Sequence, residues 1–209
     1  MTFDPDKHRR RSIRLKEYDY ALAGAYFITV CTQGRLSLFG EVVDGVVQLN
    51  DAGRIIQIAW EELPKYYVGV ETDAFVVMPN HIHGIIVLVG AGPRACPAGG
   101  RVQGPAPTIS SMLGNTEQPQ GVATIMSLPN VIHRFKTITT KRYADGVKQY
   151  GWTPFPGRLW QRNYYEHIIR SEESLNHIRQ YIAGNPMNWT IDRENPLAME
   201  PEPEDAWRI

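Results

Sequence analysis

The 209-residue sequence has little cysteine, no net charge and no long hydrophobic run. Its two cysteines, Cys31 and Cys96, are far apart and lie in no metal-ligand spacing, and Cys31 sits in an apolar run typical of a reduced core residue. Neither a signal peptide nor an apolar stretch of membrane-spanning length occurs, so we expect a cytoplasmic protein with no membrane partner. The charged residues balance at 22 basic and 22 acidic. Any nucleic-acid site must therefore be a local patch.

Several catalytic signatures are also missing. The sequence contains no Walker motif and no G-x-S-x-G motif, and neither cysteine has a histidine at a plausible local spacing. These absences exclude the common P-loop and serine- or cysteine-nucleophile schemes. The length suits one domain with an appended arm, and 43% hydrophobic residues can form a sizeable core.

The most informative stretch is 75–88, FVVMPNHIHGIIVL. Two apolar runs flank Pro79-Asn80, which is turn chemistry, so they are predicted to be adjacent strands of a buried sheet. Side chains alternate along a strand, which places His81 and His83 on one face. Two imidazoles side by side can hold one metal ion. A His-x-His pair can equally be the polar face of a strand.

The remaining chain predicts further strands and helices around this pair. We expect a strand at 25–31, a hairpin at 38–49 with an Asp-Gly turn, and strands at 71–78, 81–89 and 159–170. A helix capped by Asn50 or Asp51 is expected to run to about Leu63, where Pro64 ends it, and further helices are expected from Ser127 onwards and from Ser171 to Asn185. This order predicts an α+β, ferredoxin-like fold, with one antiparallel sheet and helices on one face. The extra C-terminal helix should cross the sheet near the histidine strand.

Composition divides the chain into a basic N-terminal arm at 1–20, a main domain at 21–190 and an acidic tail at 191–209. The main domain is interrupted at 90–123 by a Gly- and Pro-rich insertion, which we expect to be flexible. The acidic tail is expected to be disordered or loosely packed.

Three groups of residues are candidates for function. The arm contributes the basic residues Arg9, Arg10, Arg11 and Arg14, which suit either a solvated tail or a phosphate contact. The helix after Ser127 carries Arg134 and Lys136, where a solvated basic face is the alternative. On the last helix Tyr181 and Asn185 lie one turn apart, on one face. Without further information, Tyr181 reads as a core aromatic.

The stretch MPNHIH resembles the signature of the HUH endonucleases, and specifically of the REP-associated tyrosine transposases. The resemblance extends to the segment 18–40 (YDY…GAYFITVCTQGR…LFG), to Phe135-Lys136, and to Tyr181-x-x-x-Asn185. It implies that Tyr181 is the nucleophile and that His81, His83 and Asn185 bind Mg²⁺ or Mn²⁺. It also implies a metal-dependent single-strand DNA endonuclease and strand transferase that forms a 5′-phosphotyrosine on hairpin-forming repetitive DNA, as a monomer or homodimer. Arg9, Arg10, Arg11, Arg14, Arg134 and Lys136 would then contact this DNA.

Two other functions stay open from the residues alone. The chain could be a DNA-binding regulator on the same fold that does not cleave, or a small metallohydrolase that uses the His-x-His pair. A covalent phosphotyrosine–DNA adduct separates the three.

Overall fold

The computed structural model describes residues 22–89, 126–203 and 205–208. The predicted arm with its arginines and the predicted insertion at 90–123 lie outside these residues. The elements up to the first helices are β1 (Gly24–Cys31), η1 (Gln33–Arg35), β2 (Gly40–Val43), β3 (Val46–Leu49), α1 (Asp51–Glu61) and α2 (Leu63–Tyr66). They are followed by β4 (Val70–Val77), β5 (His81–Leu88), α3 (Leu128–Tyr150), β6 (Tyr165–Ile169), α4 (Glu172–Gly184) and η2 (Trp189–Ile191).

The main sheet has the strand order β4-β5-β1-β6, and every neighbouring pair in it is antiparallel. β1 lies in the centre because its sequence, GAYFITVC, is apolar on both faces. The hairpin β2–β3 turns at Asp44-Gly45, where both residues have positive φ, as a two-residue hairpin turn requires. The prediction of an α+β fold with an antiparallel sheet is confirmed.

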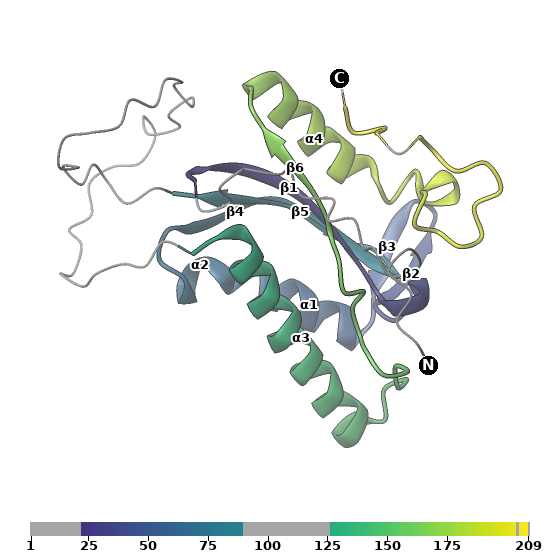
Figure 1. The fold of residues 1–209 in the computed structure, drawn as a ribbon. Helices are drawn as coiled ribbons and strands as arrows, with labels where there is room; N and C mark the ends of the chain where they lie inside the picture. The colour runs from purple at the N-terminus through teal and green to yellow at the C-terminus, as the bar shows by residue number, and fades with distance from the viewer. Residues whose placement is uncertain (1–21, 90–125, 204, 209) are drawn as a thin grey trace, which may run out of the picture.

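Helices cover both faces of this sheet (Figure 1). One core joins α1 and α3 to Tyr26, Ile28 and Val30 of β1. The other joins α4 to Ala25 and Phe27, which point the opposite way along the same strand. α4 is therefore the extra helix that the sequence predicts, and it lies on the face that carries His81 and His83.

Gly84 follows the histidine pair and determines how closely α1 approaches the sheet. A Cβ atom at this position would lie 2.5 Å from the Trp60 ring, which packs flat against Phe75 at 4.4 Å. Only glycine leaves room for this contact.

The last strand is shorter than predicted. Only Tyr165–Ile169 is β-strand, whereas the sequence predicted a strand over 159–170. The Lys136 ammonium donates to the backbone carbonyls of Gln161, Arg162 and Asn163, at 2.9, 3.3 and 3.1 Å. These carbonyls turn toward α3 instead of a neighbouring strand, and within the described ranges this stretch forms one isolated bridge, between Thr32 and Trp160.

Pro64 does not end the first helix as predicted. α1 ends at Glu61, and Pro64 lies in the first turn of α2. Proline is tolerated there because the first amides of a helix have no partner within it.

The prediction of a loosely packed tail is wrong for the described residues after 190. Asp192 and Trp207 are buried, at 1% and 4% exposure. Trp207 packs against Phe27 and His167, with ring centroids 5.6 and 4.4 Å apart, so its apolar surface holds the segment to the sheet. Among the described residues, no helix is long and apolar enough to cross a membrane.

Candidate metal centre and tyrosine site

His81 and His83 lie at the start of β5, opposite Cys31 and Thr29 of β1. Both imidazoles are buried, and their side chains lie on the same face, as the alternation predicts. Just before this strand, the Pro79 carbonyl accepts hydrogen bonds from the amides of Leu38 and Phe39, at 2.8 and 3.0 Å. The β1–β2 connection is thereby fixed next to the histidines.

Asn80 orients the first imidazole. Its Nδ2 donates to the carbonyls of Arg35 and Glu194, at 3.2 and 2.6 Å. This leaves Oδ1 as the acceptor facing His81 Nδ1 at 2.8 Å, so Nδ1 carries the proton and Nε2 has a free lone pair. His83 Nδ1 similarly meets Thr29 Oγ1 at 2.8 Å. Such outer contacts are typical of metal-binding histidines.

The two Nε2 atoms face each other at 3.0 Å, and Asp192 Oδ2 lies 3.6 Å from His81 Nε2. Asp192 Oδ2 and both amide atoms of Asn185 are buried and have no hydrogen-bond partner within the part of the chain that the structure describes. Buried polar atoms are normally paired, so three unpartnered atoms beside two imidazoles indicate a ligand. His81, His83 and Asp192 lie close enough together to hold a metal ion.

The electrostatics of the group agree with this donor set. Burial, reinforced by the neighbouring His83, holds the pKa of His81 well below its usual value, and burial lowers the pKa of His83 to about 3. Both imidazoles are therefore neutral, as metal ligands must be. Burial raises the pKa of Asp192 to about 6, so its carboxylate is charged at neutral pH, and among the described residues its ion-pair contact is with the neutral His81. The residues fit a divalent ion.

Tyr181 lies on α4 directly over this group. Its ring meets His83 edge to face, with centroids 5.4 Å apart, and its hydroxyl donates to Glu202 Oε1 at 2.6 Å. Burial, and then the contact with Glu202, raise the pKa of the Tyr181 phenol. Tyr165 lies on the same face of the sheet, whereas Tyr164 lies on the other, as the alternation predicts.

A cavity of about 170 Å³ opens between Tyr181, His83 and the segment after residue 190. Its lining includes two arginines, Arg35 and Arg193, and three carboxylates, Asp192, Glu194 and Glu202. Residues of α4, β5 and the C-terminal segment therefore line one cavity. Arg35, Asp192, Glu194 and Glu202 were not predicted as site residues. In the sequence, the three acids read only as part of an acidic, Pro-rich tail.

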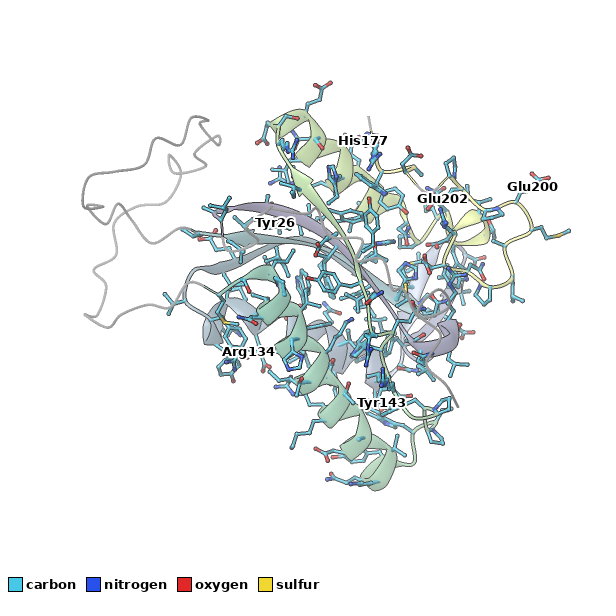
Figure 2. All side chains as sticks on the ribbon, viewed as in Figure 1. Tyr26, Arg134, Tyr143, His177, Glu200 and Glu202 are labelled. Atoms are coloured by element: carbon cyan, nitrogen blue, oxygen red, sulfur yellow. The ribbon has the colours of Figure 1, made fainter. Side chains whose placement is uncertain are left out.

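The two described residues predicted to bind DNA lie elsewhere. Arg134 is on α3, on the side of the sheet opposite Glu202 (Figure 2), and its guanidinium lies over the Tyr67 ring at 5.4 Å. Lys136, also on α3, is occupied by the carbonyls of the loop before β6. The structure therefore brings neither residue to the histidine–tyrosine site.

The chain is similar to known proteins in both structure and sequence. No family model matches the chain. Among solved structures, it is similar to a REP-associated tyrosine transposase bound to a REP hairpin, with a TM-score of 0.48, 19% identity, and coverage of 84% of this chain and 74% of that one. It is also similar to a candidate transposase from Deinococcus radiodurans R1, with a TM-score of 0.40, 17% identity and coverage of 82% and 96%.

By sequence, the chain is similar to an uncharacterised protein from Haemophilus influenzae. The two are 37% identical over 186 residues, which span 89% of this chain and 93% of the relative. Identity of this extent along nearly the whole of both proteins shows common descent. The chain belongs to the same family as this Haemophilus influenzae protein.

Proposed function

We propose that the chain is a metal-dependent single-strand DNA endonuclease and strand transferase with Tyr181 as its nucleophile. One observation carries this proposal: a tyrosine on α4 lies in ring contact with a buried His-x-His pair, and beside that pair one carboxylate oxygen and one amide have no hydrogen-bond partner among the described residues. The MPNHIH motif and the Tyr-x-x-x-Asn spacing resemble those of the REP-associated tyrosine transposases. The closeness of these two motifs, which are far apart in the sequence, supports the proposal.

His81, His83 and Asp192 would hold the metal ion, with Asn185 beside them. Two imidazoles with carboxylate and amide oxygens suit Mg²⁺ or Mn²⁺, and the imidazoles favour Mn²⁺. When bound, such an ion acts as a Lewis acid on a phosphate oxygen. Asn80 and Thr29 support this role by holding the rings with Nε2 facing the site.

The protein's own residues supply the nucleophile and a proton acceptor. The Tyr181 oxygen attacks the phosphorus, its proton passes to Glu202 Oε1, and the bond from phosphorus to the 3′ oxygen breaks. The product is a 5′-phosphotyrosine, and the freed 3′ oxygen takes up a proton from solvent. The reverse attack by a 3′-hydroxyl rejoins strands without a high-energy cofactor.

The DNA partner we propose is a hairpin with single-stranded flanks, of the REP type. In this proposal the domain at 21–190 carries the chemistry, and the arm at 1–20 contacts phosphates through Arg9, Arg10, Arg11 and Arg14. Arg134 is exposed and would contact DNA that extends to the α3 side of the sheet. Lys136 would first have to break its hydrogen bonds to three backbone carbonyls.

Trapping the covalent adduct tests the proposal. Wild-type protein incubated with hairpin DNA and Mn²⁺ should yield a nucleotide-linked peptide containing Tyr181, and chelator should prevent its formation. Tyr181→Phe should bind the DNA and form no adduct. Tyr165→Phe is the matched control, because Tyr165 lines the same cavity, and it should still react. A nucleotide on the Tyr165 peptide would refute the assignment, and binding without any adduct would favour a regulator.

A further inference from the structure

Arg35 occupies a constrained position beside the histidine–tyrosine site. It ends η1 with φ of 55°, a conformation that is rare for a residue other than glycine. Its amide donates to the Thr32 carbonyl at 3.1 Å, and its own carbonyl accepts from Asn80 Nδ2 at 3.2 Å. Asn80 also orients His81, so one buried amide fixes both the imidazole and the backbone of Arg35. Strained backbone that is held in this way is typical of functional positions.

The Arg35 side chain points into the cavity that Tyr181 and His83 line. Its Nε donates to Glu194 Oε2 at 2.9 Å, and 43% of the side chain remains exposed. The same carboxylate oxygen accepts a hydrogen bond from Cys31 Sγ at 3.2 Å. Glu194 therefore presents an anionic oxygen to the guanidinium at the edge of the site.

A phosphodiester offers the guanidinium the same kind of contact as this carboxylate. Both present two anionic oxygens in a fork that matches the donors of arginine. Asn80 Nδ2 holds the backbone carbonyls of both Arg35 and Glu194, so only the side-chain contact can be exchanged, when the Glu194 carboxylate turns away from the guanidinium. Asp192, Glu194 and Glu202 would otherwise repel a DNA strand entering the cavity.

We propose that Arg35 binds a backbone phosphate of the DNA strand next to the Tyr181 hydroxyl and that Glu194 occupies Arg35 until DNA arrives. This inference rests on the proposed function, because it takes single-stranded DNA as the substrate. Arg35 holds the phosphate, and Glu194 competes with it for the same donors. The alternative is an ordinary ion pair that anchors the C-terminal segment and has no part in binding.

A double-mutant cycle separates the two. DNA affinity is measured by fluorescence anisotropy with a labelled hairpin oligonucleotide that has single-stranded flanks, in Mn²⁺, on the Tyr181→Phe background so that no cleavage intervenes. Arg35→Ala should weaken binding by about tenfold, and Glu194→Ala should tighten it several-fold. Because Glu194 acts by competing for Arg35, Glu194→Ala should change nothing once Arg35 is alanine.

Two controls accompany the cycle. Arg54→Ala removes an exposed arginine paired with Asp51 on α1, outside the cavity, and should leave affinity unchanged. Arg35→Lys keeps the charge but loses the planar fork, and it should recover only part of the affinity. Thermal unfolding of each variant confirms that it is folded.

The outcomes decide the inference as follows. Unchanged affinity of Arg35→Ala overturns it, as does equal tightening by Glu194→Ala with and without Arg35, which would show simple charge repulsion. If the wild type forms an adduct on Tyr181 but the Arg35 and Glu194 variants all bind DNA equally well, only the role of Arg35 is refuted. If the affinities change as expected but the wild type forms no adduct, only the proposed cleavage is refuted. If the wild type binds no DNA, both proposals are refuted.

Discussion

The Tyr181 hydroxyl donates to Glu202 across 2.6 Å, joining α4 to a residue in the C-terminal segment. Glu202 can therefore accept the proton of the Tyr181 phenol, whose pKa is raised by burial. Glu200 and Glu202 lie on the same segment (Figure 2), but Glu200 is exposed and only Glu202 lines the cavity. This pair of glutamates allows a controlled test.

Glu202→Gln should slow adduct formation by about a hundredfold, because glutamine still accepts the hydrogen bond but cannot take the proton. DNA affinity should not fall, since the change removes a negative charge from the cavity. The measurement is the single-turnover rate of phosphotyrosine formation, with Glu200→Gln as the control. Faster adduct formation by Glu202→Gln would show instead that the carboxylate restrains the tyrosine.

Asp192→Asn should stabilise the metal-free protein and abolish its response to metal. Burial raises the pKa of Asp192 to about 6, above the unfolded value, so its buried charge destabilises the fold as pH rises through that pKa. In chelator near pH 8, we expect a gain on the order of 2 kcal/mol in the free energy of unfolding. Mn²⁺ should raise the Tm of the wild type far more than that of the variant.

The exposed Asp205 is a control for Asp192, and Asp205→Asn should change neither quantity. His81→Ala should likewise remove the Mn²⁺ response, whereas Asn185→Ala should reduce it less, since water can replace an amide ligand. An Asp192→Asn protein with an undiminished Mn²⁺ response would exclude Asp192 as a ligand.

The ion pair between Asp73 on β4 and Arg179 on α4 should make stability fall in acid. Two parallel hydrogen bonds, of 3.0 and 2.6 Å, join the side chains, and the Arg179 contact holds the pKa of Asp73 below its usual value. The stabilisation is therefore complete above the unfolded pKa, about 4, and is lost as pH falls through the lower folded pKa.

Asp73→Asn should cost about 1 kcal/mol in urea unfolding at neutral pH, since the pair is only partly buried, and the deficit should shrink below about pH 4. Asp51→Asn, which breaks an exposed pair with Arg54, should cost less. A deficit that is independent of pH would mean that the charge of Asp73 does not contribute.

Gly84→Ala should destabilise the protein by about 1–3 kcal/mol, because the new methyl group would overlap the Trp60 ring. The strand should shift at the residue next to His83, so the Mn²⁺ response should weaken as well. Gly24→Ala is the matched change on β1, where the nearest atom lies 3.8 Å from the added carbon, and it should be tolerated. Equal stability of the two variants would contradict the packing argument.

Deletion of residues 1–16 should weaken DNA binding and flatten its dependence on salt, because the arginines of the arm would no longer displace counterions. The slope of log affinity against log salt concentration measures this effect. The same slope with and without the arm would rule out phosphate contacts by Arg9, Arg10, Arg11 and Arg14.

The sequence by itself determined the secondary structure of most of the described chain and one half of the site. Alternation along 75–88 predicted that His81 and His83 share a face, and the one-turn spacing of Tyr181 and Asn185 predicted their common helix face. These are local relationships, set by backbone geometry within a few residues. The shortened β6 was missed because Lys136, a distant residue, binds the carbonyls of the loop that precedes it.

Only the tertiary structure decided which residues complete the site. Asp192, Glu194 and Glu202 lie in a segment whose composition is typical of a disordered tail, and nothing local distinguishes one acid from another. Trp207 packs on Phe27 and His167, Asn80 Nδ2 donates to the Glu194 carbonyl, and the segment held by these contacts carries the three acids beside Tyr181, His81 and Arg35. Such contacts join residues that are far apart in the chain. They depend on packing and hydrogen bonds between distant segments, which no local spacing in the sequence encodes.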